Sequence, residues 1–223
     1  MRLIVSGACG HMGLAVLRQM KRCAEPVILA AAIDPRGKGG CLQQIKQYSG
    51  PADAIIDFSD PSGARTLLRY AAVRRIPLVM GTTGLSAEQK DYMRRCAALV
   101  PIFYSENYAV GIGFLHRTLC SAAKVFPKAE CQIVEVHRSR KVDVPSGTAL
   151  ALARALGKEV PIHSMRCAEI VGEHTVYLFL EGEVLVFSHR AQDRALFARG
   201  ALSAAAFLQN RRPGLYGMED LLS

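Results

Sequence analysis

The first segment of the chain reads Leu3-Ile4-Val5-Ser6-Gly7-Ala8-Cys9-Gly10-His11-Met12-Gly13. Its apolar residues predict a short buried strand, and the closely spaced glycines predict a tight turn into a helix over 12–23. Glycines at such a turn allow a pyrophosphate to approach the backbone N–H groups at the helix start. The G-x-x-G-x-x-G spacing is a variant of the dinucleotide-binding fingerprint, although turn glycines also occur without any ligand.

Beyond this segment, apolar runs rich in β-branched residues alternate with helical stretches. The breaker-rich residues 34–40 leave room for only a short helix near 41–47. Such alternation is typical of a parallel sheet with helices on both faces, which predicts an α/β, Rossmann-like domain. The predicted strands are 3–5, 27–33, 54–58, 78–80 and 102–104, and the predicted helices are 12–23, 62–75 and 87–98.

The pattern changes near residue 109. A helix over 112–125 and a strand over 131–136 are followed by two adjacent strands, 175–180 and 184–188, around a Glu-Gly turn. Strands without intervening helices imply a mixed or antiparallel sheet. We therefore expect a second, α+β domain over 109–194 that binds substrate and forms oligomer contacts. A helix over 195–209 then leads back to the dinucleotide-binding domain, which comprises 1–108 and 195–223.

Composition narrows the class of protein. The 223 residues can bury a sizeable core, and half of them are apolar. The formal charge of +9 is spread along the chain without a nucleic-acid motif, so small anions are better candidate partners than nucleic acid. Seven scattered cysteines without a C-x-x-C pair are expected to be reduced and mostly buried, with no metal site. No membrane-spanning or signal segment is evident, which predicts a cytoplasmic protein without membrane contacts.

Further candidate cofactor groups follow the other predicted parallel strands. Asp34 lies about 20 residues beyond the glycines, where a carboxylate can bind an adenosine ribose, although it could equally be a turn residue before Pro35. Arg36 could meet a 2′-phosphate, so NADH and NADPH both stay open, with Asp34 favouring NADH. The loops 81–84 and 105–108 end predicted parallel strands, where α/β sheets bind ligands.

The run Glu135-Val-His-Arg-Ser-Arg-Lys-Val-Asp-Val-Pro-Ser-Gly-Thr-Ala149 places four cationic or proton-carrying groups before a helix start. Ser146 is a good N-cap, and Gly147 lets an anion approach the free N–H groups of the first turn. The run predicts an anion-binding site that also holds a proton donor. A solvated strand end followed by a capped helix is the alternative interpretation.

Together these segments resemble the 4-hydroxy-tetrahydrodipicolinate reductase (dihydrodipicolinate reductase) family over nearly the whole chain. The likeness is most specific in the run 135–149 and extends to the glycine loop, Asp57-Phe58-Ser59 and Gly81-Thr82-Thr83-Gly84. It implies NADH- or NADPH-dependent reduction of 4-hydroxy-tetrahydrodipicolinate to tetrahydrodipicolinate in lysine and diaminopimelate biosynthesis. It also implies a homotetramer.

The resemblance implies roles for individual residues. His137 and Lys141 would handle the proton, and Arg138, Gly147 and Thr148 would hold the dicarboxylate substrate. The cofactor would contact Gly7, Ala8, Cys9, Gly10, His11, Met12, Asp34, Gly81, Thr82, Thr83, Ser105, Glu106, Asn107 and Tyr108. Arg138 stands where the family commonly has a second histidine, which keeps open another nicotinamide-dependent imine or dicarboxylate oxidoreductase. A non-catalytic dinucleotide-binding protein is the other alternative.

Overall fold

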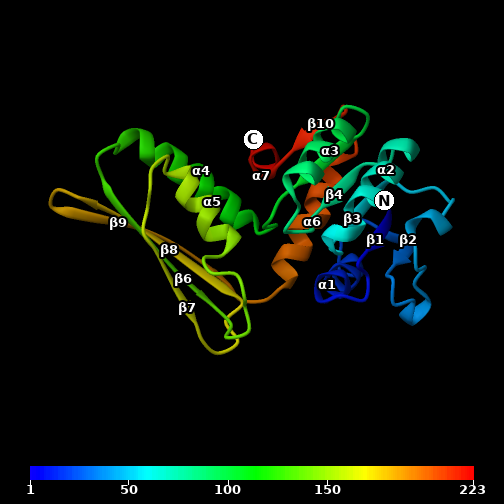
Figure 1. Cartoon of the computed structure of the whole chain (residues 1–223), viewed down its shortest axis with the longest axis horizontal. Helices are drawn as coiled ribbons and strands as arrows, with labels where there is room; N and C mark the ends of the chain where they lie inside the picture. Colours follow the sequence, from blue (N-terminus) through cyan, green and yellow to red (C-terminus); the bar gives the residue numbers. More distant parts are fainter. The chain divides into compact units, whose positions relative to one another are not determined.

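The computed structural model describes residues 1–223 and divides them into two compact units (Figure 1). The first unit comprises Met1–Tyr108, Phe197–Leu221 and Ser223. The second comprises Ala109–Leu196 and Leu222. None of the helices combines the length and the apolar character that a membrane-spanning segment needs.

The first unit is built on a six-stranded sheet in the order β10-β5-β4-β3-β1-β2. Every neighbouring pair in it is parallel. The strands are β1 (Arg2–Ser6), β2 (Ile28–Ile33), β3 (Ala54–Asp57), β4 (Leu78–Met80), β5 (Pro101–Tyr104) and β10 (Gly214–Tyr216). The Rossmann-like α/β prediction is confirmed.

Helices cover both faces of this sheet, because its strands are apolar on both sides. Ile4 and Ile55 point to one face and pack with residues of α2 and α3. Leu3 and Val5 point to the other face and pack with residues of α1 and α6. Alternate residues of a strand face opposite sides, so a continuous apolar run needs two covering layers. The helices are α1 (His11–Met20), α2 (Ala64–Arg74), α3 (Ala87–Ala97), α6 (Ala195–Leu208) and the short α7 (Met218–Leu221).

Two elements of the first unit differ from the sequence expectation. Two separate 3-10 turns, Lys38–Gly40 and Ile45–Gln47, replace the short helix expected near 41–47, because Gly37 and Gly39 adopt positive φ angles and interrupt a helical path. The edge strand β10 was not predicted from the sequence, because its three residues are too few to show a recognisable alternation.

The second unit has a mixed four-stranded sheet in the order β7-β6-β8-β9. Its strands are β6 (Glu130–His137), β7 (Ile162–Arg166), β8 (Gly172–Leu180) and β9 (Glu183–Ala191). β6 is parallel to β7 and antiparallel to β8, and β8 and β9 form the expected hairpin. β7 is absent from the sequence prediction because its residues, Ile-His-Ser-Met-Arg, lack a clear apolar alternation.

Two helices, α4 (Val110–Val125) and α5 (Gly147–Ala155), lie along one face of the mixed sheet (Figure 1). Ile133, Val176 and Leu178 point to this face and are buried. The opposite face of the sheet carries apolar side chains that no helix covers. The register of β8 and β9 pairs Tyr177 with Val186 and Phe179 with Val184, so these four side chains lie together on this face. We call this surface the open face, and define it by Met165, Tyr177, Phe179, Val184 and Val186.

Candidate active site

A fully buried carboxylate lies at the centre of the second unit's site. Glu135 is in β6, and its Oε1 accepts hydrogen bonds from the Ser146 backbone N–H at 3.1 Å, the Ser164 hydroxyl at 2.7 Å and the Arg166 guanidinium at 2.8 Å. Burial alone raises the pKa of Glu135, but these hydrogen bonds outweigh it and lower the pKa to about 2. Glu135 is therefore a carboxylate at neutral pH.

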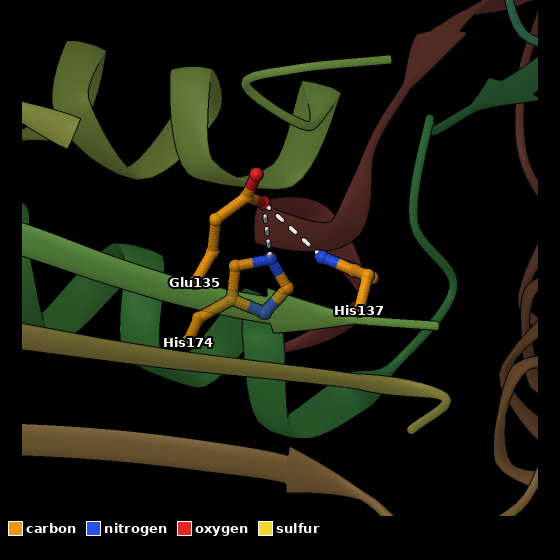
Figure 2. A group of neighbouring side chains, drawn as sticks. All are labelled: Glu135, His137 and His174. Carbon is orange, nitrogen blue, oxygen red and sulfur yellow. Dashed lines mark ion pairs between the residues drawn. The ribbon is translucent and has the colours of Figure 1, made fainter. Parts of the chain in front are cut away.

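The other oxygen of Glu135 faces two imidazoles (Figure 2). Oε2 lies 3.3 Å from Nδ1 of His137 and 3.8 Å from Nε2 of His174. His137 is two residues further along β6 and so shares the face of Glu135, whereas His174 of β8 is paired with Glu135 across the sheet. One carboxylate therefore contacts both rings, whose centroids are 5.0 Å apart.

Both histidines have lowered pKa values, which favour the neutral imidazole in the free protein. Burial lowers the pKa of His137, although the charge of Glu135 opposes this shift. Burial, followed by the nearby His137, lowers the pKa of His174 to about 3. The Nε2 atom of His137 lies against Gly172, where an added Cβ would come within 3.0 Å of it. A side chain at position 172 would therefore crowd the imidazole nitrogen opposite the one that faces Glu135.

The start of α5 is tied to this carboxylate. Ser146 caps the helix by accepting from the Ala149 N–H at 3.2 Å, and its hydroxyl lies 3.3 Å from Nε2 of His174. Gly147 and Thr148 form the first helical turn and are partly exposed. The polar network thus fixes the helix N-terminus, where an anion would find N–H donors and the positive end of the helix dipole.

The segment between β6 and α5 carries the cationic groups. The Lys141 Nζ lies 2.8 Å from Oδ2 of Asp143, and the Lys141 side chain is 22% exposed. Burial by itself raises the pKa of Asp143, but the hydrogen bond and the charge of Lys141 act together with smaller contributions to lower the pKa. Arg138 is partly exposed, and its carbonyl accepts from the Lys141 N–H at 3.0 Å. All five predicted catalytic and substrate residues therefore lie in one segment, 137–148, of the second unit.

Glu135, His137 and His174 could also act as metal ligands in purely geometric terms. Their candidate ligand atoms all lie within 4.8 Å of one another. Arg166 already neutralises the carboxylate, and its positive charge 2.8 Å away disfavours a dication at this point. We assign no metal to these residues.

Sequence reasoning missed Glu135, Ser164 and Arg166 as site residues. A signal existed for Glu135, because it lies in the predicted strand 131–136, two positions before His137, and alternate residues of a strand share a face. The other two residues come from β7, which the sequence pattern did not predict.

The glycine loop of the first unit forms a tight cradle between β1 and α1. Gly7 has φ of 73°, and a Cβ added there would lie 2.3 Å from the Phe58 carbonyl oxygen. A Cβ on Gly13 would lie 2.1 Å from the Gly7 carbonyl oxygen. The α1 N-cap residue, Gly10, has no side chain to cap the helix, so the first N–H groups point to an uncapped end. This geometry fits a dinucleotide pyrophosphate.

Asp34 lies directly beside the cradle at the end of β2. Its buried carboxylate accepts the Cys9 N–H at 3.0 Å and two hydrogen bonds from the Arg36 guanidinium, at 2.8 and 3.0 Å. The Arg36 hydrogen bond holds the pKa of Asp34 well below its usual range. Asp34 is therefore ionised, and Arg36 is positioned next to the group expected to bind ribose.

The remaining predicted cofactor residues follow β4 and β5 at the same carboxyl edge of the sheet. Thr82 donates its hydroxyl hydrogen to the buried Asp57 at 2.5 Å. Ser105 donates to the Asn107 carbonyl at 2.6 Å, which shapes the loop after β5. The Tyr108 hydroxyl is buried and donates to the Met80 carbonyl at 2.9 Å. The sheet thus gathers the loops after β1, β2, β4 and β5 at one edge.

We expect Gly7→Ala to lower the free energy of unfolding by about 2 kcal/mol or more, since the new methyl group meets backbone atoms that cannot rotate away. Urea unfolding measures this change. Gly39→Ala is the matched control, because Gly39 has a similar φ of 63° but no atom within 4 Å of the added Cβ. Equal losses in the two variants would contradict the cradle geometry.

Acid should destabilise the second unit through His174. Its pKa is about 3 in the folded protein against 6.5 ordinarily, so below pH 6.5 the unfolded chain takes up a proton that the folded chain refuses. Stability should fall by up to about 1.4 kcal/mol per pH unit for this group as the pH drops from 6.5 toward 4.5. In urea titrations His174→Gln should flatten this slope, and His163→Gln, at an exposed position, should leave it steep. Equal slopes in both variants would refute the assignment.

The two units carry different functional groups. A parallel sheet with a glycine cradle and an adjacent buried carboxylate, in one chain with a unit that holds a histidine, a lysine and an N-capped helix start, is typical of a nicotinamide-dinucleotide-dependent oxidoreductase. Residues 1–108 match the family model described as dihydrodipicolinate reductase, N-terminus, and residues 111–222 match the model for the C-terminus of the same family. The chain belongs to the dihydrodipicolinate reductase family.

Relatives match the chain over its full length. A 4-hydroxy-tetrahydrodipicolinate reductase from Stenotrophomonas maltophilia (strain K279a) is 40% identical, with 100% of this chain and 98% of the relative covered. The enzyme of that name from Caldanaerobacter subterraneus subsp. tengcongensis is 37% identical, covering 99% and 98%. The fold is similar to that of dipicolinate-bound dihydrodipicolinate reductase from Paenisporosarcina sp. TG-14, with a TM-score of 0.82, 21% identity and coverage of 99% and 98%. The family uses NADH or NADPH.

Proposed function

We propose that this protein reduces 4-hydroxy-tetrahydrodipicolinate to tetrahydrodipicolinate, with NADH or NADPH as reductant, in the biosynthesis of diaminopimelate and lysine in the cytoplasm. The observation that carries the proposal is that one carboxylate, Glu135, lies 3.3 Å from Nδ1 of His137 and also accepts the Ser146 N–H at the start of α5, with Lys141 in the segment that connects β6 to α5. This arrangement offers positive charge, N–H donors and a proton source to an anion. The names of the full-length relatives agree with it.

The substrate's two carboxylates require several donors. Arg138 and Lys141 supply positive charge, and Arg138 can bind a carboxylate through two parallel hydrogen bonds. Gly147 and Thr148 supply backbone N–H groups at the helix start. Arg138 binds but does not deliver protons near neutral pH, so at this position the chain favours affinity over proton transfer.

The bound nicotinamide supplies the hydride, and the chain must supply a proton to the atom that gains electron density. His137 turns Nδ1 toward Glu135, which leaves Nε2 as the nitrogen that exchanges a proton with substrate. Two substrate carboxylates near this ring raise the pKa of His137, which burial keeps low in the free protein. Substrate binding therefore favours the protonated form of His137, which then donates the proton. Lys141 is the second donor.

Consumption of reduced nicotinamide, followed by its absorbance, tests the function directly. The substrate is generated in place by its synthase, and NADH and NADPH are compared at equal concentration. Turnover that depends on the synthase product supports the proposal. Cofactor binding without turnover would contradict it and favour a non-catalytic dinucleotide-binding protein. Turnover only with a different cyclic imine or dicarboxylate would favour the second candidate, which the unusual Arg138 keeps open.

We also propose that small molecules and copies of itself are the partners of this protein, and that four copies assemble through the open face. Val184 and Val186 are 48% and 54% exposed there, and a patch of this kind is typical of subunit interfaces.

Val186→Glu should shift the mass measured by analytical ultracentrifugation from tetramer to smaller species. Val73→Glu, on α2 of the first unit at 73% exposure, should leave the mass unchanged. A Val186→Glu protein that remains tetrameric would exclude this interface.

A further inference from the structure

Two cysteine sulfurs lie next to each other at the glycine cradle of the first unit. Cys9 belongs to the cradle, Cys41 follows the 3-10 turn Lys38–Gly40, and their Sγ atoms are 3.6 Å apart. Both residues are partly exposed, as are three more of the seven cysteines, which corrects the expectation that most would be buried. A disulfide bond is about 2.05 Å long, so the two sulfurs need to approach by about 1.5 Å.

The segment before Cys41 has room to make this approach. Gly39 and Gly40 have φ of 63° and 78°, and a Cβ added at either position would meet nothing within 4 Å. The backbone there is therefore both conformationally permissive and uncrowded. Burial, followed by the neighbouring Cys9 thiol, raises the pKa of Cys41, and the positive charge of Arg36 opposes this shift only in part. The short distance between the sulfurs and the freedom of residues 39–40 are therefore the features that favour bond formation.

The same segment is linked to the group expected to bind ribose. The Cys9 N–H donates to Asp34 at 3.0 Å, and the Asp34 N–H donates to the carbonyl of Leu42, the residue after Cys41, at 2.9 Å. A covalent bond between the two sulfurs would fix residues 38–41 against the cradle. Asp34 would then be held between Cys9 and Leu42, which lie next to the two ends of this bond. The adenosine half of the cofactor would then meet a less adaptable and more crowded surface.

We propose that Cys9 and Cys41 form a redox-active thiol pair, which a peroxide converts to a reversible disulfide that weakens dinucleotide binding. One thiolate attacks a peroxide oxygen, which forms a sulfenic acid and releases hydroxide. The second thiolate then attacks the sulfenic sulfur, forms the S–S bond and displaces a second hydroxide. Two sulfurs lose two electrons to the peroxide, and the two thiol protons convert both hydroxides to water. A dithiol reductant reverses the reaction by exchange.

Peptide mass mapping after treatment with hydrogen peroxide tests bond formation. The expected result is a linked peptide containing Cys9 and Cys41, which disappears in Cys9→Ser and Cys41→Ser and persists in Cys23→Ser, a change at another partly exposed cysteine. Dithiothreitol should remove the link. A folded, oxidised wild-type protein in which both thiols remain free, or pair with other cysteines, would overturn the proposal.

The effect on the cofactor rests on the proposed cofactor-binding residues and is measured separately. Titration with NADH should give a dissociation constant at least about tenfold higher for the oxidised protein, with full recovery after reduction. Cys41→Ser should bind NADH equally well before and after peroxide. An unchanged affinity in fully linked wild-type protein would overturn the coupling. Reduced wild-type protein that binds no dinucleotide would instead count against the proposed function, so the two failures are distinguishable.

Discussion

Lys141→Ala and His137→Ala should each lower kcat by about 10²–10⁴-fold, the usual contribution of a positioned proton donor. The change should spare cofactor affinity, because both residues belong to the second unit whereas the cradle, Asp34 and the loops after β4 and β5 belong to the first. Steady-state kinetics with saturating substrate, together with NADH titration of each variant, measures both quantities.

Two further variants separate charge from proton transfer at position 141. Lys141→Arg keeps the positive charge but holds its proton too tightly to donate it, so it should recover substrate KM more than kcat. Lys124→Ala removes an exposed lysine of α4 and serves as the control for loss of one charge in the second unit. Normal turnover in both Lys141→Ala and His137→Ala would remove these residues from the mechanism.

Glu135→Gln should lower kcat by about 100-fold and move the alkaline loss of activity to lower pH. The charge of Glu135 raises the pKa of His137. Removing that charge lowers the pKa, so the ring loses its proton at lower pH and fewer enzyme molecules hold it at neutrality. We therefore propose Glu135 as a positioning residue that acts through His137. The pH dependence of kcat measures the shift, which a purely structural role would not produce.

Stability needs its own control in this experiment, since Arg166 is only 15% exposed and loses its charge partner in Glu135→Gln. Breaking a buried ion pair in this way costs about 3–5 kcal/mol. The double variant Glu135→Gln with Arg166→Met removes both charges and should regain much of this stability while kcat stays low. If the double variant also regained activity at the wild-type pH profile, Glu135 would be a structural residue only.

Local patterns predicted the elements whose apolar period is unambiguous. The strand over 78–80 and the capped helix start at Ser146 were placed correctly, because a buried parallel strand and an N-cap each have a signature within a few adjacent residues. The strand β7 was missed, since its five residues lack a clear alternation of apolar and polar side chains. The site shows the same difference between local and long-range signals. His137 and Lys141 lie in one short stretch of sequence and could be predicted from it. Arg166 contacts Glu135 only because β6 and β7 pair, which no local pattern indicates.

The pairing of Glu135 with His174 across β6 and β8 also determines which changes in chain length the protein can accept. The side chains of a strand alternate between faces, so a one-residue insertion in β8 between His174 and Tyr177, with the later pairs to β9 kept, would turn this imidazole to the side of Tyr177 and Phe179. Added residues at the Glu181-Gly182 turn leave that register untouched. Natural length variation and loop grafting should therefore concentrate at the hairpin tip, while the stretch from His174 to Leu180 keeps a fixed length.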